Sequence, residues 1–236
     1  QKWRDWINSV EKVYGTTSWR KTFAQKIYGI PAEKLGTLVL GIDSDRLPPN
    51  PAEVRQRIRN ELGIPQDAFV FVTGGKLGNY RCILESLNAF MAIPNESARF
   101  LLFGAVLSDV QSEFNRIVSK DSRIIFIGYQ NSLEIHNFFI ASDFGVFPGL
   151  HSVLWEEAIG CGLPCLFHKY EEHDHTEICG NCVRISSPDV TSIHAVLLHV
   201  LNDQAFYEKL KAQAQIAATE YSYHAIAKKS LEMANL

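Results

Sequence analysis

The sequence predicts an α/β protein built on a doubly wound parallel sheet with helices on both faces. Two observations carry this prediction. Short apolar runs without polar alternation, such as Phe100–Phe103 and Phe144–Phe147, are typical of strands buried on both faces. Segments with helical periodicity, of about 10–15 residues, separate these runs and indicate crossovers between parallel strands.

The predicted elements follow one another regularly. We expect strands at 38–40, 68–72, 100–103, 123–127, 144–147, 164–167 and 183–185. Helices are expected between them, and at 189–202, 204–219 and 223–235 near the end. The clearest helix start is Asn50-Pro51-Ala52-Glu53, because Asn caps, Pro suits the first helical position and Glu follows three residues after the cap.

The first 36 residues do not form a complete fold by themselves. Ser18 is expected to cap a helix that stops at Gly29. The tryptophans of this segment need a packing surface, either the edge of the following domain or a neighbouring domain outside this sequence. We therefore divide the chain into a helical connection (1–36), a main domain (37–220) and a C-terminal helix (221–236). The sequence begins at Gln1, with neither an initial Met nor a signal peptide, so we expect it to be a piece of a longer protein.

Composition excludes several classes of protein. The 236 residues carry a net charge of −3 without a basic run, so we expect no nucleic-acid partner. No apolar stretch approaches the ~20 residues that span a bilayer, so we expect no transmembrane segment. Cys82, Cys161 and Cys165 lie in apolar contexts, and the cysteine count of 5 is odd. Both facts favour a reducing compartment, and we expect a cytoplasmic protein.

Candidate ligand-binding residues follow the predicted strands, because ligands of open parallel sheets bind outside the carboxyl ends of the strands. Lys76 and Arg81 place two cations after one strand. The turn at 149–153 opens a helix, whose free N–H groups favour an anion. Each feature alone also fits a tight turn or a solvated charge. Together they indicate a phosphate or diphosphate site, and no Gly-x-Gly-x-x-Gly follows the first strand as a dinucleotide enzyme would require.

The helix after this turn is almost wholly apolar but carries two adjacent acids, Glu156 and Glu157. A carboxylate is costly to bury unless something binds it. The spacing of Val153, Leu154 and Ala158 predicts that Glu157 lies on the buried face and meets a ligand, while Glu156 is structural. The alternative is that Glu157 pairs with a nearby lysine.

Five segments together resemble the C-terminal, donor-binding domain of GT-B glycosyltransferases, closest to the retaining glycosyltransferase family 4. They are Gly41-Ile42-Asp43, the stretch 62–69, Gly75-Lys76-Leu77 with Arg81, the stretch 127–143, and Glu157-Ala158-Ile159-Gly160-Cys161-Gly162-Leu163-Pro164. The match covers roughly residues 35–220. The resemblance implies a Rossmann-like domain, one half of a GT-B fold, that binds a nucleoside diphosphate sugar.

The resemblance also implies roles for individual residues. Lys76 and Arg81 would hold the donor diphosphate and act catalytically by stabilising the leaving group. Glu157 would bind the ribose hydroxyls. The full implied donor-binding set is Gly75, Lys76, Arg81, Tyr129, Gln130, Gly149, His151, Ser152, Val153 and Glu157. Tyr129 and Gln130 would lie against the base, and the turn His151-Ser152-Val153 would offer backbone N–H groups.

The implied activity is transfer of a sugar to an acceptor hydroxyl, with retention of configuration and without a metal or other cofactor. The acceptor glycan, or lipid-linked glycan, would bind a missing N-terminal domain that could also associate with a membrane. This fragment alone is expected to turn over little. The alternatives are a non-catalytic nucleotide-sugar-binding module and a GT-B epimerase or phosphorylase.

Two departures from the family pattern stand out. The family has two glutamates, and Gly149 takes the place of the first. Three consequences are open: a different sugar, a role taken by His151, or reduced activity. His173 and His175 replace a glycine-rich loop, and we expect them to face the donor pocket and contact sugar or acceptor. The alternative is that they lie in a plain surface loop. Histidines with Cys179 and Cys182 could instead bind zinc, but their spacing is not that of a standard finger, and we expect no metal.

Overall fold

The computed structural model describes residues 2–132, 134–170 and 174–234. Its core is a parallel sheet of six strands in the order β5-β4-β3-β6-β7-β8. The strands are β3 Val70–Leu77, β4 Arg99–Val106, β5 Ile124–Phe126, β6 Phe144–Phe147, β7 Cys165–His168 and β8 Cys182–Ile185. The predicted doubly wound sheet is confirmed. Strand order reverses between β3 and β6, and a ligand crevice is expected at the carboxyl ends of these two strands.

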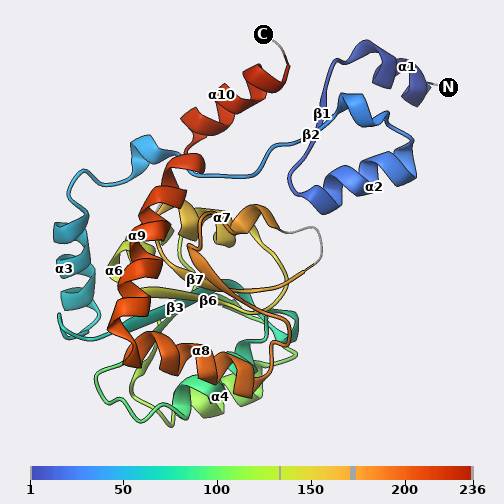
Figure 1. Cartoon of the computed structure of the whole chain (residues 1–236). Helices are drawn as coiled ribbons and strands as arrows, with labels where there is room; N and C mark the ends of the chain where they lie inside the picture. Colours follow the sequence, from blue (N-terminus) through green and yellow to red (C-terminus); the bar gives the residue numbers. More distant parts are fainter. Residues whose placement is uncertain (1, 133, 171–173, 235–236) are drawn as a thin grey trace.

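Helices cover both faces of the sheet (Figure 1). One face packs against α4 Ile83–Met91, α5 Gln111–Val118 and α8 Val190–Asn202. The other packs against α3 Pro51–Glu61, α6 Ile135–Ala141, α7 Val153–Gly160 and α9 Gln204–Glu220. Within β3, Phe71 joins the first apolar cluster, whereas Val70 and Val72 join the second. Successive side chains of a strand point to opposite faces, and here both faces are buried, which explains the continuous apolar runs.

A buried ion cluster lies at the amino end of the sheet, just before β6. The Oδ1 atom of Asp143 accepts from Arg55 at 2.5 Å, and its Oδ2 atom accepts from Arg59 at 2.7 Å. Oδ2 also accepts the backbone N–H of Val70 at 2.8 Å. Arg59 is completely buried. This cluster ties α3 to the starts of β3 and β6.

The N-terminal segment forms a separate lobe (Figure 1). It consists of α1 Lys2–Ser9, β1 Val13–Gly15, α2 Ser18–Tyr28 and β2 Leu35–Thr37. β1 and β2 pair in parallel, so β1-α2-β2 is a small βαβ unit. The strand predicted at 38–40 is therefore wrong, since the strand ends at Thr37 and belongs to this second sheet. Thr17, not Ser18, caps α2 through its side chain.

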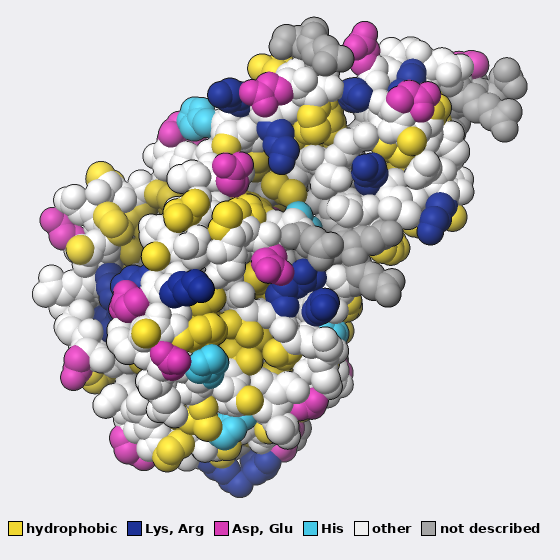
Figure 2. Space-filling view, viewed as in Figure 1, with side chains coloured by type: hydrophobic (Ala, Val, Ile, Leu, Met, Phe, Trp, Pro, Cys, Tyr) yellow, Lys and Arg dark blue, Asp and Glu magenta, His cyan; other side chains and the backbone are white. Residues whose placement is uncertain are grey.

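The lobe has a small apolar cluster of its own, formed by Ile7, Ile30 and Leu35 with Val13 and Ala24. Hydrophobic side chains also remain at its surface (Figure 2). They are Trp6, Trp19, Ile27 and Tyr28, each more than two-fifths exposed. Trp6 and Trp19, two of the tryptophans that were expected to need a packing surface, thus keep more than two-fifths of their surface exposed.

The last helix, α10 Tyr223–Met233, approaches the lobe from the main domain. Tyr14 donates its hydroxyl to the carbonyl of Ser230 at 3.1 Å, and Ile42 forms a parallel bridge with Ser222. Short 3₁₀ turns lie at Ala32–Lys34 (η1), Ser44–Arg46 (η2), Asn79–Arg81 (η3) and Asp174–Thr176 (η4). Within the described residues, no helix has the length and apolar character needed to cross a bilayer.

Candidate functional site

The end of β3, which carries Lys76, lies close to the start of α7. Gly75 has φ +97°, which favours glycine, and a Cβ there would lie 2.9 Å from the Leu154 Cδ1 atom in the first turn of α7. The end of β3 therefore lies against the start of α7. Lys76 is exposed at this strand end, and Val153 at the helix start is 43% exposed. A cation and free helix N–H groups at one accessible edge can bind an anion.

The turn after β6 packs directly on η3. A Cβ at Gly149 would overlap the backbone of Arg81, and Leu150 donates its N–H to the carbonyl of Tyr80 at 2.8 Å. In this backbone arrangement no side chain fits at residue 149. The glutamate of the family pattern is therefore excluded here by the close approach of two backbone segments.

Arg81 does not project freely into the crevice. Its guanidinium donates to the carbonyl of Leu150, and it lies 5.0 Å from the ring centroid of Tyr80. The contact holds the 149–150 turn against η3. In this arrangement Arg81 supports the turn, and Lys76 is the exposed cation of the predicted pair.

The structure corrects the assignment of the two acids in α7. Glu156 is completely buried, whereas Glu157 is half-buried. Glu157 is the less buried of the two acids, and the prediction that it lies on the buried face holds for only part of its side chain: its Oε2 atom is inaccessible and has no hydrogen-bond partner among the described residues. Val153, which was counted as buried, is 43% exposed. One helical turn separates Val153 from Glu157, so both lie on the same accessible face of α7.

Glu157 lines a hollow of about 220 Å³ next to the crevice. The other lining residues are Gly41, Ile42, Asp43, Arg46, Ser132, His136 and Tyr223. Burial, and then the neighbouring Glu156, raises the pKa of Glu157 to about 7. A carboxyl group that is partly protonated at neutral pH can donate as well as accept hydrogen bonds, which suits hydroxyl groups. Sequence reasoning missed Ser132 and His136.

The structure does not bring Tyr129 and Gln130 to Glu157. Tyr129 follows β5 and is 80% exposed. Gln130 donates to the carbonyl of Ile127 at 2.7 Å and lines a different hollow, between α3 and α6. Their predicted place against a base is untested. The same loop does reach the hollow of Glu157 through Ser132.

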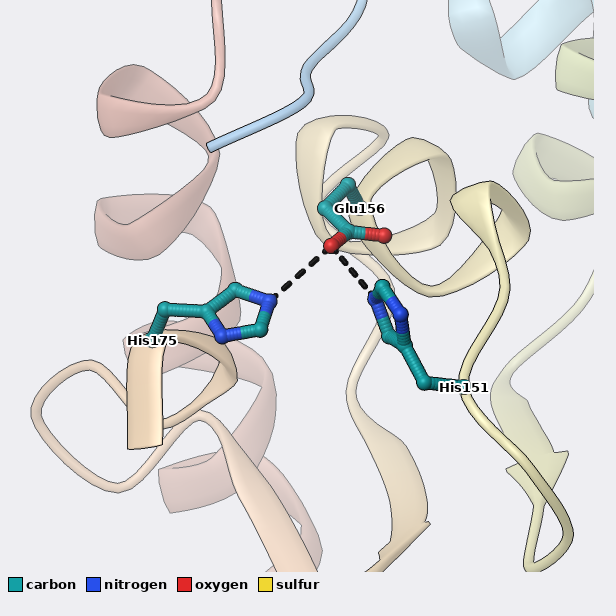
Figure 3. A group of neighbouring side chains, drawn as sticks. All are labelled: His151, Glu156 and His175. Atoms are coloured by element: carbon teal, nitrogen blue, oxygen red, sulfur yellow. Dashed lines mark hydrogen bonds and ion pairs between the residues drawn. The ribbon is translucent and has the colours of Figure 1, made fainter. Parts of the chain in front are cut away.

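Two histidines converge on the buried acid (Figure 3). The Nε2 atom of His151, from the turn after β6, lies 2.6 Å from the Oε1 atom of Glu156. The Nε2 atom of His175, from η4, lies 3.0 Å from the same oxygen. The two imidazole rings are nearly perpendicular, with centroids 5.4 Å apart. The fold thus joins residues from the loops after two neighbouring strands, which helical periodicity could not foresee.

The histidines keep Glu156 ionised despite its burial. Burial alone would raise the pKa of Glu156, but the hydrogen bonds and charges of His151 and His175 together hold that pKa below its usual value. The second carboxylate oxygen, Oε2, is buried and has no hydrogen-bond partner among the described residues. The buried carboxylate is therefore only half satisfied.

The zinc grouping suggested by the sequence does not appear among the described residues. The one His, Cys, Asp or Glu group that the described residues bring close enough to hold an ion is His151, Glu156 and His175, which contains no cysteine. Cys179 is exposed, and Cys182 makes a long contact to the carbonyl of Thr176. His173 lies outside the described residues, so its predicted place facing the donor pocket stays a prediction.

The sheet order, the crevice at the strand reversal and the layers of helices define the fold of one half of a GT-B glycosyltransferase. The C-terminal domain of the group 1 glycosyltransferase LpcC from Francisella tularensis aligns with a TM-score of 0.65 at 19% identity. That alignment covers 78% of this chain and 100% of the LpcC domain. The chain therefore has the fold of the C-terminal, Rossmann-like half.

Two longer proteins are similar over nearly the whole chain. The structure of HepE from Anabaena, in complex with UDP and glucose, aligns with a TM-score of 0.74 at 19% identity over 98% of this chain. O-antigen chain mannosyltransferase B of Escherichia coli is 21% identical over 230 residues, 92% of this chain. The chain spans only 65% of HepE and 58% of the mannosyltransferase. The sequence matches no family model.

Proposed function

We propose that the chain is the donor-binding part of a glycosyltransferase that moves a sugar from a nucleoside diphosphate sugar to an acceptor hydroxyl, with retention of configuration. The observation that carries this proposal is the accessible edge where the end of β3, with the exposed Lys76, lies against the start of α7. Lys76 and the helix N–H groups bind the diphosphate and stabilise its charge as it leaves. The HepE complex with UDP and glucose supports a uridine nucleotide as the first ligand to test.

The hollow beside the crevice takes the nucleoside. Glu157 lies one turn along α7 from the proposed diphosphate position and faces a hollow that Ser132 and His136 also line. Its carboxyl group binds the ribose hydroxyls. Arg81 acts on the diphosphate indirectly, because it holds the turn that positions the helix start.

The N-terminal lobe belongs to a second domain that binds the acceptor glycan or lipid-linked glycan. Its βαβ unit leaves Trp19 and Ile27 exposed on α2, which suits contact with further structure. The protein acts in the cytoplasm, where nucleotide sugars are available, and any membrane contact is made through that second domain.

Calorimetry on the purified chain tests this proposal. UDP, UDP-glucose, GDP and GDP-mannose are titrated, and at least one is expected to bind. Lys76→Ala should weaken that binding by about 1–3 kcal/mol, the range for a hydrogen bond to a charged group. Lys120→Ala removes an exposed lysine between α5 and β5, at the opposite edge of the sheet, and should change nothing. Equal losses in both variants, or no binding at all, would rule out the site.

Glu157→Ala distinguishes the nucleoside position from the diphosphate position. It should weaken binding of the nucleoside diphosphate while leaving binding of inorganic diphosphate unchanged. If both ligands weaken equally, Glu157 does not contact the ribose.

A second candidate function is a binding module without catalysis, and Gly149 is the observation that favours it. The glutamate expected there lies near the donor sugar in the family pattern, and the backbone of Arg81 leaves no room for it. Product analysis with the full-length protein separates the possibilities, because a transferase forms a glycoside, a phosphorylase a sugar phosphate and an epimerase a new nucleotide sugar.

A further inference from the structure

His151, Glu156 and His175 present three ligand atoms to one point (Figure 3). The Nε2 atoms of both histidines and a carboxylate oxygen of Glu156 all lie within 4.8 Å of one another. We propose that these side chains form a binding site for a divalent transition-metal ion of the zinc type. The site does not include Lys76, and its test uses no nucleotide. The outcome is therefore independent of the proposed transferase function.

The burial of Glu156 is the first argument for an ion. Its side chain is completely inaccessible, yet its Oε2 atom has no hydrogen-bond partner among the described residues. A buried carboxylate that is only partly satisfied is costly, because the low local dielectric strengthens every missing interaction. As metal ligands the two imidazoles are neutral, so a bound cation would supply the positive charge that the buried carboxylate needs.

The ligand types select the class of metal. Two imidazole nitrogens with one carboxylate oxygen are the protein ligands of many catalytic zinc sites, which keep a fourth position open. Imidazole suits zinc, copper, iron and nickel, whereas magnesium and calcium prefer sites made of oxygen atoms alone. The set therefore favours zinc-type ions over magnesium.

The spacing requires only a small adjustment. Ligand atoms about 2.0–2.1 Å from a tetrahedral ion are about 3.3 Å apart. The nitrogens of His151 and His175 lie 2.6 and 3.0 Å from the Glu156 oxygen, so the first must move outward by about 0.7 Å and the second by about 0.3 Å. The His151 side chain is 18% exposed and lies in a turn, which provides both the freedom to move and a path for the ion.

Neighbouring residues hold the ligands in place. The ring of His151 meets Trp155 edge-on, with centroids 5.2 Å apart. The buried Tyr221 donates its hydroxyl to the backbone carbonyl of His175, and Asn181 donates to the carbonyl of Thr176 at 3.1 Å. Such outer contacts orient metal ligands. A bound ion would tie η4, after β7, to the turn after β6 that forms one wall of the crevice.

The experiment is a zinc titration of the purified chain after treatment with a chelator. We expect one equivalent of Zn²⁺ per chain, a rise in the melting temperature that chelator reverses, and no competition from excess Mg²⁺. Changes in outer contacts weaken metal sites about 10–100-fold, so loss of a ligand in Glu156→Gln or His175→Gln should weaken binding at least about 100-fold. His151→Gln, at a partly exposed side chain, serves if the buried variants do not fold.

The controls separate this site from other histidines and cysteines. His224→Gln alters an exposed histidine that contacts Asp45, and Cys179→Ser with Cys182→Ser removes the cysteines of the sequence hypothesis. Both controls should bind zinc as the wild type does. The proposal is overturned if the wild type binds no zinc, if Mg²⁺ displaces it, or if the cysteine variant loses zinc while Glu156→Gln retains it.

Discussion

Asp143, whose side chain is 13% exposed, and Glu156, whose side chain is completely buried, are carboxylates at opposite ends of the sheet. At the amino end, both oxygens of Asp143 accept hydrogen bonds, from two arginines and a backbone N–H group. At the carboxyl end, one oxygen of Glu156 accepts from two histidines, and the other has no partner among the described residues. A fully satisfied hydrogen-bond network makes a fold rigid. A buried polar network with an unsatisfied atom is instead typical of functional sites, where a local rule of stability is broken.

The largest expected effect comes from breaking the complete network. Asp143→Asn should lower the free energy of unfolding by about 3–5 kcal/mol, because it leaves Arg55 and the buried Arg59 without a counter-charge. Urea unfolding measures this loss. Asp45→Asn, at an exposed pair with His224, should cost less than about 1 kcal/mol. Similar losses in the two variants would contradict the structural role of the Asp143 cluster.

The next effect concerns the turn that carries His151. Gly149→Ala should lower stability by about 1–3 kcal/mol, since the added Cβ overlaps the backbone of Arg81 and the turn must shift. Thermal unfolding measures the loss of stability, and nucleotide calorimetry measures any loss of affinity that follows from the shifted turn. Leu150→Ala trims a half-exposed side chain but keeps the carbonyl that accepts from Arg81, so nucleotide affinity should stay unchanged there. If Gly149→Ala left the protein as stable as the wild type, the turn would be free to adapt.

A smaller effect is expected at the incomplete network. Glu156→Gln without metal should change the free energy of unfolding by only about 0.5–1.5 kcal/mol, because the amide oxygen still accepts from the histidines. Urea unfolding in the presence of chelator gives this value for direct comparison with Asp143→Asn. A loss of about 3 kcal/mol or more would place Glu156 in the same structural class as Asp143 and remove the contrast between the two ends.

The smallest effect sets the baseline for an ordinary surface charge. Arg57 and Glu61 form an exposed pair one turn apart on α3, the helix that also carries Arg55 and Arg59. Arg57→Ala should change stability by about 0.5 kcal/mol or less in the same urea assay. A cost approaching that of Asp143→Asn would mean that α3 is held by its surface charges and not by the buried cluster.

The strands of the six-stranded sheet and most helices were predictable, because burial on both faces of that sheet leaves a direct trace in the residue pattern. β6 was placed at 144–147, and α8 and α9 agree with their predicted bounds to within one residue. The start of α6 was not. The spacing of Asn131 and Glu134 is that of a capping box, and Asn131 does accept the N–H of Glu134 at 3.2 Å, but α6 begins only at Ile135. Local patterns thus identify elements better than their ends.

The candidate site was predictable only in part. Lys76 and the start of α7 follow from the rule that ligands meet the carboxyl ends of parallel strands, which needs only strand positions. Which of Glu156 and Glu157 is more deeply buried depends on which side of a short helix is covered. Periodicity over so few residues gave the wrong order, because it counted Val153 as buried although Val153 is 43% exposed.

The sequence by itself determined the parallel sheet, the strand ends that carry Lys76 and Gly149, and the resemblance to a donor-binding domain. These follow from hydrophobic periodicity and local motifs, which act over a few residues. Tertiary structure decided that Arg81 leaves no space for a side chain at Gly149 and that His151 and His175 meet at Glu156. Such contacts join loops that are distant in the chain, and their geometry is set by the packing of neighbouring strands.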